Sequence, residues 1–379
     1  MPTADELISP DGIRRLSGIL QEAAPVASRW QAVADSAALL RPLGLSERAR
    51  TVGDALLADC GRDYEQLAHA VRRSLTRADL TGWMIWPVSE AVAVGATASG
   101  TGRHFDDGLD LLARLTPRLT GEFALRTFLV ADLDRTLATA LTWTGSPDPA
   151  VRRLASEGTR PKLPWARQVA ALNRDPAVTL PVLDRLYTDA SPDVRRSVAN
   201  HLNDVSRLDA ALAAEAAARW LRKPESTTPA LVRHAMRTLV KKGEPAALEL
   251  VGFHGGGEDV KVVGPLLSKT DVPMGGDLVF TARITNVSDG PVSLAIDYVV
   301  HHLKANGRPA PKVFKLAKRR LGPGESADLT RSHSFRPLTT RVYYPGAHAV
   351  QLQVNGHRYD RADFRLLKAD GPVSPEAGE

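Results

Sequence analysis

The chain has 379 residues, which is long enough for two domains. Hydrophobic residues make up 43% of the sequence and aromatic residues only 5%, a balance that favours helices over an all-β chain. The formal net charge of +6 is compatible with an anionic partner. The single cysteine, Cys60, excludes an internal disulfide and a cysteine-rich zinc site.

Residues 1–10 lack the basic start and the apolar run of a signal peptide. No apolar stretch approaches the roughly 20 residues needed to span a bilayer. We therefore expect a soluble cytoplasmic protein that does not contact membranes.

Residues 1–254 show the apolar spacing of amphipathic helices, separated by short breaks that contain Pro, Gly and Asp. Within this part, the segments Val151-Arg152-Arg153, Val194-Arg195-Arg196 and Val232-Arg233-His234 each follow a proline. They recur at intervals of about 40 residues, which is typical of HEAT-like repeats with two helices per unit. We expect each proline to lie in the first turn of the second helix, and the arginines to lie along one surface.

Residues 258–368 have the alternating pattern of β-strands, as in the buried-side candidates Leu278, Phe280 and Ile284. Asn355-Gly356 predicts a hairpin turn. The number and length of the strand-like runs predict an immunoglobulin-like β-sandwich, although the paired cysteines of antibody domains are absent. The fold class is thus a HEAT-like α-helical repeat solenoid followed by this sandwich, joined by a glycine linker at 254–257. Residues 369–379 are expected to form a disordered tail.

Glu157 is in an unusual position for a carboxylate. It precedes Gly158, a candidate helix C-cap, and so meets the negative end of the helix dipole. It is also surrounded by basic residues, and local conflicts of this kind often mark functional sites. A salt bridge to Arg153 or Arg160 would explain it without any function, and the two interpretations have about equal weight.

Glu122 and Trp165 are weaker candidates when they are considered one at a time. Glu122 follows Thr120-Gly121 at an expected helix start, where acidic residues are common and Thr120 could be the N-cap. Trp165 follows Leu163-Pro164 at another expected helix start, where it could stack on a base or sugar, or pack between repeats.

Basic residues of both parts predict a surface that holds the phosphate backbone of DNA. A charge run is usually only a solvated face, but two such surfaces on two domains favour a clamp. The segment 304–320 contains no acidic residue. The predicted DNA-binding residues are Arg126, Arg152, Arg153, Arg160, Lys162, Arg195, Arg196, Arg233, Lys241, Lys242, Lys304, Lys312, Lys315 and Arg319.

Other familiar signals are missing from the sequence. There is no phosphate-binding glycine loop, no Cys/His metal spacing and no Gly-x-Ser-x-Gly motif. His301 and His302 are adjacent on an expected strand, so they point to opposite faces and cannot share a metal ion. We expect neither a metal nor a cofactor.

Two segments resemble the AlkC branch of DNA alkylation repair glycosylases. One runs from Gly121-Glu122-Phe123-Ala124-Leu125-Arg126 to Phe128-Leu129, and the other is the long and unusual stretch 148–166, which includes Ser156-Glu157-Gly158-Thr159-Arg160-Pro161. The C-terminal stretches at 298–302, 312–316 and 344–346 look like the immunoglobulin-like domain of one AlkC subgroup. The resemblance covers nearly the whole chain and is weakest before about Ala78.

The resemblance implies a monofunctional glycosylase of base excision repair. Such an enzyme hydrolyses the glycosidic bond of cationic N-alkylated bases, such as 3-methyladenine and 3-methylcytosine, without flipping the base into a deep pocket, and leaves an abasic site. By motif match, the catalytic residues would be Glu122, Glu157 and Trp165. The expected partner is double-stranded DNA with alkylated bases, and a monomer is expected.

A different class of function remains open from the residues alone. HEAT-like repeats often serve as scaffolds that bind a protein or a nucleic acid without catalysis. Base release is the property that separates an enzyme from such a scaffold.

Overall fold

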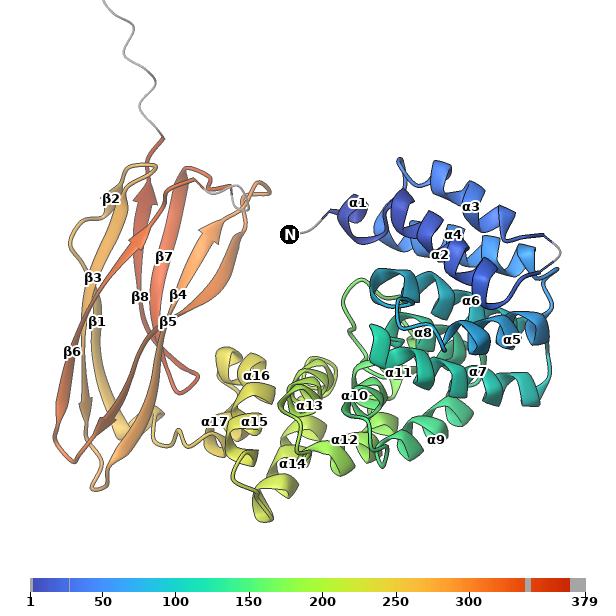
Figure 1. The fold of residues 1–379 in the computed structure, drawn as a ribbon. Coiled ribbons are helices and arrows are strands. Elements are labelled where there is room, and N and C mark those ends of the chain that lie inside the picture. The colour runs from blue at the N-terminus through green and yellow to red at the C-terminus, as the bar shows by residue number, and fades with distance from the viewer. Residues whose placement is uncertain (1–2, 27, 338–341, 369–379) are drawn as a thin grey trace, which may run out of the picture. The chain divides into compact units, whose positions relative to one another are not determined.

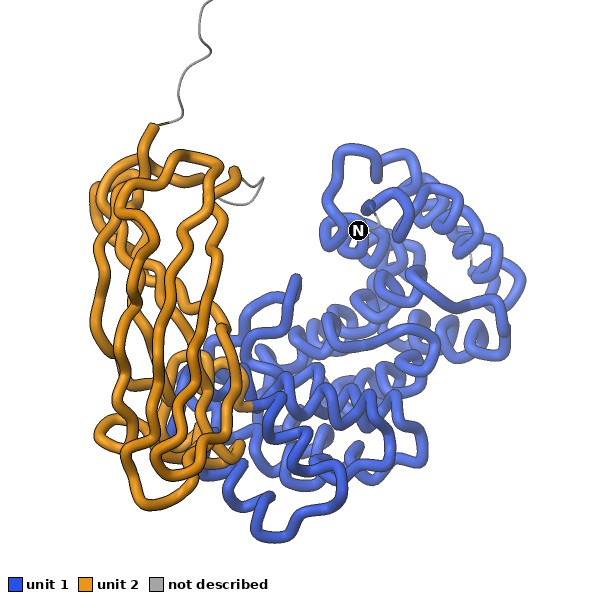
Figure 2. The backbone as a smooth tube through the Cα atoms, turned by 90° about the vertical axis from the view of Figure 1, so that its left-hand side faces the viewer, with its two compact units in different colours: residues 1–235 blue, residues 236–379 orange. Residues whose placement is uncertain are grey.

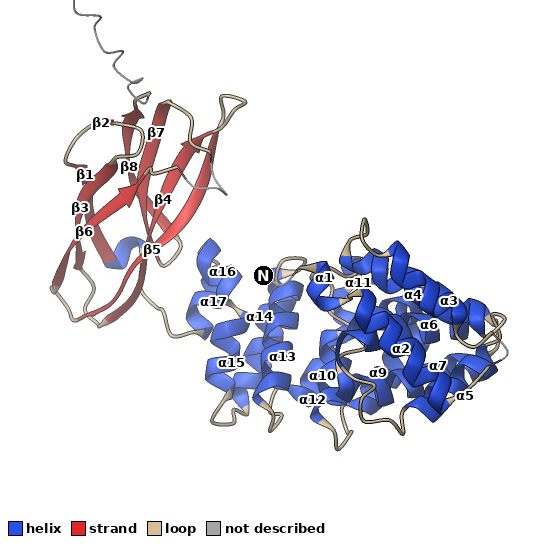
Figure 3. Cartoon of the chain, turned by 45° about the horizontal axis from the view of Figure 1, so that its top comes forward, coloured by secondary structure: helices blue, strands red, loops and turns tan. Residues whose placement is uncertain are grey.

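The structure, a computed structural model, describes residues 3–26, 28–337 and 342–368, with helices first and strands last (Figures 1 and 3). The predicted tail at 369–379 lies outside the described residues. The chain divides into two compact units, residues 1–235 and 236–379 (Figure 2). The last α-helix ends at Leu250 and the first strand begins at Val260, so the change from helices to strands lies inside the second unit, because the last two helices belong with the strands.

The first unit consists of helices that pack against helices near them in the chain, and many of the most extensive contacts skip one helix. They are α1 (Ala4–Leu7), α2 (Pro10–Ala23), α3 (Gln31–Ser36), α4 (Leu45–Asp59), α5 (Tyr64–Ser74), α6 (Ile85–Ala98), α7 (Gly102–Leu115), α8 (Glu122–Ala131), α9 (Leu133–Trp143), α10 (Pro149–Glu157), α11 (Ala170–Arg174), α12 (Leu180–Leu186), α13 (Pro192–Val205), α14 (Ala210–Arg222) and α15 (Thr228–Ala235). Short 3-10 turns lie at Ala37–Leu39, Gly82–Met84, Thr116–Arg118 and Pro176–Thr179. None of the helices in the described ranges is long and apolar enough to cross a bilayer.

The prolines of the repeats lie where the sequence predicts them. Pro149 is the first residue of α10, and the carboxylate of Asp148 accepts a hydrogen bond from the amide of Ala150. Pro192 likewise begins α13. Proline suits a first helical turn because its missing N–H would have no partner there. The apolar faces of α10 and α13 then pack together, which stacks one repeat on the next.

The second unit begins with two helices and continues as a sandwich. Its elements are α16 (Arg237–Lys242), α17 (Pro245–Leu250), a 3-10 turn (Gly257–Asp259), β1 (Val260–Leu267), β2 (Asp271–Val272), β3 (Asp277–Asn286), β4 (Val292–Leu303), β5 (Pro309–Leu321), β6 (Ser326–Ser334), β7 (Gly346–Val354) and β8 (His357–Leu366). One sheet has the order β1-β3-β6 and the other β2-β8-β7-β4-β5. Their inner faces enclose an apolar core, which is the packing expected of a sandwich.

The period-two pattern of the sequence reports this core correctly. Leu278, Phe280 and Ile284 on β3 are buried. Asn355 and Gly356 form the turn between β7 and β8, and both have the positive φ that a tight hairpin requires. The basic stretch of the sequence lies on and before β5, at the edge of the five-stranded sheet.

Candidate functional site

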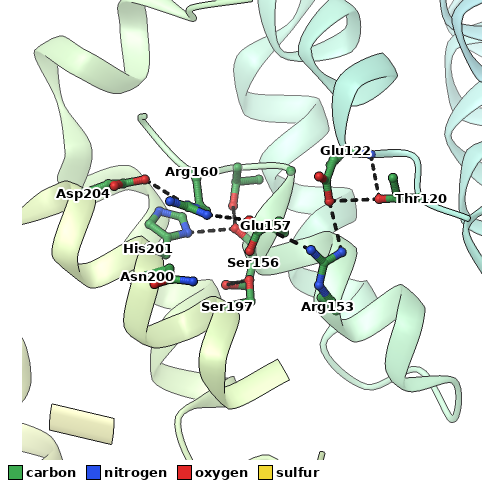
Figure 4. A network of polar contacts seen from close by, with 12 residues as sticks. Thr120, Glu122, Arg153, Ser156, Glu157, Arg160, Ser197, Asn200, His201 and Asp204 are labelled. Carbon is green, nitrogen blue, oxygen red and sulfur yellow. Dashed lines mark hydrogen bonds and ion pairs between the residues drawn. The ribbon is translucent and has the colours of Figure 1, made fainter. Parts of the chain in front are cut away.

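Glu122 is the first residue of α8, as the sequence predicts, but the N-cap of that helix is Gly121 and not Thr120. Thr120 instead donates its hydroxyl hydrogen to Glu122 Oε2 at 2.9 Å. The same oxygen accepts a hydrogen bond from Arg153 Nη1 at 3.0 Å (Figure 4). Thr120, which precedes α8, and Arg153, which lies on α10, therefore hold Glu122 in a fixed position.

Glu157 is the last residue of α10 and is buried, with 7% of its surface exposed. Its Oε1 accepts a hydrogen bond from Arg160, and the guanidinium of Arg153 lies 4.0 Å from the same oxygen. Both of the salt bridges that could explain Glu157 without any function are present. They offset the unfavourable interaction of the carboxylate with the helix C-terminus.

Gly158 is the C-cap of α10, but its backbone is right-handed (φ −67°) and not left-handed. The reason for glycine at this position is space. A Cβ on Gly158 would lie only 2.5 Å from Leu125 Cδ2, so glycine allows α8 to approach the end of α10 closely. This approach brings Glu122 and Glu157 to the same arginine.

Arg160 extends the chain of alternating charges to a third carboxylate. Its Nε donates to Asp204 Oδ2 at 2.9 Å, and Asp204 lies on α13 (Figure 4). We call Glu122, Arg153, Glu157, Arg160 and Asp204 the carboxylate network. It contains three carboxylates and two guanidiniums, so its formal charge is negative.

Asp204 and His201 support the network from α13. Burial raises the pKa of Asp204, and the hydrogen bond and charge of Arg160 oppose this rise. Burial lowers the pKa of His201 to about 3, so its ring is neutral, and Nδ1 donates to the carbonyl of Ser156 at 2.8 Å. A neutral histidine adds no positive charge beside the carboxylates.

Trp165 does not begin a helix, contrary to the expectation from Leu163-Pro164. It lies in the loop between α10 and α11 with a left-handed backbone (φ 62°), and 70% of its surface is exposed. Left-handed backbone is uncommon for a bulky residue and indicates that the surrounding structure imposes it. The exposed indole is available to a partner.

Arg126 holds this loop in place from α8. Its Nη1 donates to the carbonyls of Gly158 and Arg160, and its Nε donates to the carbonyl of Arg167 at 3.0 Å. Only 1% of Arg126 is exposed. This predicted DNA-binding residue thus clamps the loop that carries Trp165 and is not placed to contact phosphate directly.

The arginine pairs of the repeats separate into two classes. The first arginine of each pair donates to carbonyls of the turn before its own helix, Arg152 to Ser146 and Pro147 and Arg195 to Asp189 and Ala190. Arg152 also bonds to the Asp189 carboxylate of the next repeat at 2.6 Å. The second arginine of each pair does not contact that turn. Arg153 belongs to the carboxylate network, and Arg196 is exposed on α13. The expected single row of arginines stays a prediction: Arg152 and Arg195 make equivalent contacts in their repeats, and Arg152 also joins its repeat to the next.

The remaining predicted DNA-binding residues are accessible in each unit. Lys162 is half-buried in the Trp165 loop. Those that are exposed are Arg196, Arg233, Lys241, Lys242, Lys304, Lys312, Lys315 and Arg319. Lys315 and Lys241 both act electrostatically on the buried Asp297 of β4, which places a strand lysine and a helix lysine of the second unit near one carboxylate.

The structure brings Glu122 and Glu157 together, but among the described residues no contact joins Trp165 to either carboxylate. Glu122 and Glu157 meet at Arg153, while Trp165 lines a pocket with Phe123, the residue that follows Glu122. Asp204 was missed by sequence reasoning. Its only signal is an acidic residue within the apolar face of a predicted helix, and such residues are rarely buried unless they are paired.

The arrangement offers negative charge to a cationic partner. Among the described residues, neither Glu122 Oε1 nor Glu157 Oε2 accepts a hydrogen bond. Each carboxylate thus has one oxygen in use and one available. A pair of fixed carboxylates of this kind can stabilise a developing positive charge and position a water molecule.

Comparisons with known proteins cover both units. Residues 261–368 match the family model described as "Uncharacterised protein YhaZ, C-terminal Ig-like domain". The chain is 36% identical over 263 residues to protein YhaZ of Bacillus subtilis strain 168, an alignment that covers 69% of this chain and 72% of YhaZ. It is also similar to the alkylpurine DNA glycosylase AlkC of Pseudomonas fluorescens, whose structure is bound to DNA containing an abasic site analog.

The likeness to AlkC extends over almost the entire length of both proteins. The TM-score is 0.79 at 31% sequence identity, and the match covers 96% of this chain and 99% of the AlkC chain. Both the helical repeats and the sandwich therefore have counterparts in one known protein. The chain belongs to the AlkC family of DNA glycosylases, in the group whose helical repeats are followed by an immunoglobulin-like domain.

Proposed function

We propose that this protein is a monofunctional glycosylase that removes cationic N-alkylated bases, such as 3-methyladenine and 3-methylcytosine, from double-stranded DNA in base excision repair. One observation carries the proposal: Glu122 and Glu157 converge on Arg153, and the loop that follows α10 presents Trp165 to solvent. The AlkC relative is an alkylpurine DNA glycosylase, and its DNA contains an abasic site analog, which fits the product of this reaction.

The substrate supplies much of the driving force. An alkylated base with a positive charge is a good leaving group, because the electron pair of the breaking C1′–N bond neutralises it. No general acid is then needed. The developing charge moves to the deoxyribose, and fixed negative charge near C1′ lowers the energy of that transition state.

The two carboxylates divide the remaining work. One stabilises the sugar cation, and the other orients a water molecule, whose oxygen bonds to C1′ while its proton passes to the carboxylate. The products are a neutral free base and an abasic site. None of the five network side chains is a lysine amine, so we expect no covalent imine and no strand cleavage.

Arg153 has a regulatory position in this scheme. In the free protein its guanidinium lies between Glu122 and Glu157, where it neutralises both. A cationic sugar and Arg153 would compete for the same carboxylates. We propose that a DNA phosphate draws Arg153 aside on binding, so that the carboxylates face the lesion only when DNA is present.

Trp165 contacts the sugar in this proposal. The face of an indole is rich in electrons and attracts cations by about 0.5–2 kcal/mol, depending on solvent exposure. The clamp of Arg126 on the loop fixes where that face lies. The base stays in the DNA helix until the bond breaks, and selectivity comes from the charge and lability of the lesion.

The exposed basic residues hold the DNA backbone. We assign phosphate contacts to Lys162, Arg196 and Arg233 in the first unit, and to Lys241, Lys242, Lys304, Lys312, Lys315 and Arg319 in the second unit. Each such contact releases counterions, so the affinity must fall steeply with salt.

The experiment that tests this function is base release. The protein is incubated with methylated duplex DNA, the released bases are separated by chromatography, and alkali is added to convert abasic sites into strand breaks. We expect free 3-methyladenine and breaks that appear only after alkali. DNA binding without base release would identify a scaffold instead.

A further inference from the structure

A pocket of about 250 Å³ lies beside Trp165, and the proposed chemistry does not use it. Its walls come from α4, α6, α8 and the loop at 165–167. We call it the aromatic pocket, and the residues that matter most are Arg50, Trp86, Glu90, Phe123, Arg126 and Trp165. Because all of them belong to the first unit, the pocket is defined without reference to the sandwich.

Aromatic rings form one side of the aromatic pocket. Trp86 and Phe123 are stacked with their ring centroids 4.2 Å apart, and Trp165 adds an exposed indole. Aromatic walls favour ligands with flat apolar faces. The pocket therefore suits a ring system better than a flexible chain.

Arg126 contributes a buried cation to the wall of the aromatic pocket. Its Nε and Nη1 bond to carbonyls of the Trp165 loop, but its buried Nη2 has no hydrogen-bond partner among the described residues. Burial lowers the pKa of Arg126 to about 10, so it stays cationic at neutral pH. Because Nη2 is fully buried, a ligand in the pocket does not reach this donor, and Arg126 contributes its charge instead.

Glu90 contributes hydrogen-bond acceptors to the aromatic pocket. Its Oε1 accepts a hydrogen bond from Trp86 Nε1 at 3.0 Å. Burial raises the pKa of Glu90, while the Trp86 bond and the charge of Arg50 oppose the rise. Asp54 is a second carboxylate in the lining. These groups can accept hydrogen bonds from an amino group on a ligand.

The combination of groups favours a heteroaromatic base over an anion. A phosphate would be repelled by Glu90 and Asp54 and attracted by the three lining arginines, and it would leave the aromatic walls of the pocket uncovered. A purine instead has flat faces for the aromatic rings and an amino group that donates to Glu90. The volume also accommodates a single base.

We propose that the aromatic pocket binds the free alkylated purine after its release from DNA. The identity of the ligand rests on the proposed glycosylase function, since that reaction generates the base. The location is suitable because Phe123 follows Glu122 in α8 and Trp165 lies at both sites. The protein is then inhibited by its own free base, and the occupied pocket slows turnover.

The direct test is isothermal titration calorimetry of the full chain with free 3-methyladenine and adenine, with inorganic phosphate as the anion probe. We expect saturable binding of the bases with Kd below about 1 mM and none for phosphate. Phosphate binding without base binding, or no saturable binding of either base, would overturn the proposal.

Two matched variants locate the binding. Val94 lines the pocket and is 37% exposed, so Val94→Trp fills the mouth without burying a new side chain in the core. Val130 on α8 is 47% exposed and does not line the pocket, so Val130→Trp is the control. We expect Val94→Trp to weaken base binding by about ten-fold or more and Val130→Trp to leave it unchanged. Equal binding by the two variants would contradict the assignment.

Kinetics separate this proposal from the proposed function. Free 3-methyladenine should inhibit multiple turnovers of the wild type and of Val130→Trp, but not of Val94→Trp, while all three release base at the same rate in a single turnover. Base release without binding of the free base overturns the pocket assignment alone. Binding of the free base without any release overturns the glycosylase proposal alone.

Discussion

The charged residues of the two units are arranged in opposite ways. In the first unit, the carboxylate network pairs three carboxylates with two guanidiniums, and Glu157, Arg160 and Asp204 are buried. In the second unit, the predicted DNA-binding residues of the sandwich are exposed, and none of them forms a salt bridge with a described residue. They are Lys304, Lys312, Lys315 and Arg319. Paired, buried charges have fixed positions, whereas exposed charges act at a distance and are screened by salt.

The difference implies that the two units have different roles in the proposed reaction. Fixed carboxylates are suited to stabilising a charge that develops at one atom. Exposed lysines and arginines are suited to a phosphate backbone, which needs attraction more than precise geometry. Substitutions in the network should therefore change stability or the rate of base release, and substitutions near β5 should change DNA affinity.

The largest effect is expected from Arg160→Met. The substitution leaves Glu157 and Asp204 without their shared partner, and breaking a buried ion pair typically costs about 3–5 kcal/mol of folding free energy. Urea unfolding followed by circular dichroism measures it. Arg196→Met, at the exposed arginine of α13, should cost less than about 1 kcal/mol. Similar losses in the two variants would show that the network is not a stabilising unit.

Glu157→Gln should greatly slow base release while the fold and DNA binding persist. Loss of one fixed group that stabilises transition-state charge lowers rates by about 100-fold or more. Single-turnover release of 3-methyladenine measures the rate, and Glu215→Gln on the exposed face of α14 is the control. Full activity of Glu157→Gln would remove this residue from the proposed mechanism.

The double substitution of Lys315→Gln with Arg319→Gln should weaken DNA binding by roughly ten-fold at low salt. It should also lower the slope of log affinity against log salt by about 2, one for each phosphate contact that is lost. Fluorescence anisotropy over a salt series measures both quantities. Lys261→Gln with Lys269→Gln, on and after β1 in the other sheet, is the matched control. An equal effect of both pairs would indicate attraction by net charge alone.

The smallest effect is expected from Asp297→Asn. Burial raises the pKa of Asp297 to about 6, and Lys315 and Lys241 oppose the rise. The unfolded chain loses this proton at lower pH than the folded chain, so ionisation of Asp297 lowers the stability as pH rises from about 4 to about 6. Asp297→Asn should therefore be more stable at pH 7–8 by on the order of 1 kcal/mol, and the gain should vanish below pH 4. A gain that is independent of pH would contradict this account.

The sequence predicts the architecture well because it depends on local patterns. Period-two alternation identifies β3, and the prolines identify the starts of α10 and α13. The conflict at Glu157 is also visible, since a carboxylate at a helix C-terminus is unfavourable in any fold. The partner that resolves it, Arg160, is only three residues away.

The rest of the site depends on how repeats stack. Asp204 is 44 residues from Arg160, and no local pattern connects them. The sequence does not distinguish the two arginines of a pair. In the structure, Arg152 contacts Asp189 of the next repeat, whereas Arg153 contacts Glu122. The loop of Trp165 is likewise fixed by the distant Arg126.

The most direct test of the proposed division of labour measures two quantities in two variants. The single-turnover rate of 3-methyladenine release at saturating protein and the Kd for DNA are determined for Glu157→Gln and for Lys315→Gln with Arg319→Gln. We predict that the first variant loses the rate and keeps the Kd, while the second keeps the rate and has a higher Kd. If both variants had a lower rate and a higher Kd, the result would contradict the proposal that the first unit performs the chemistry and the second unit attracts the DNA.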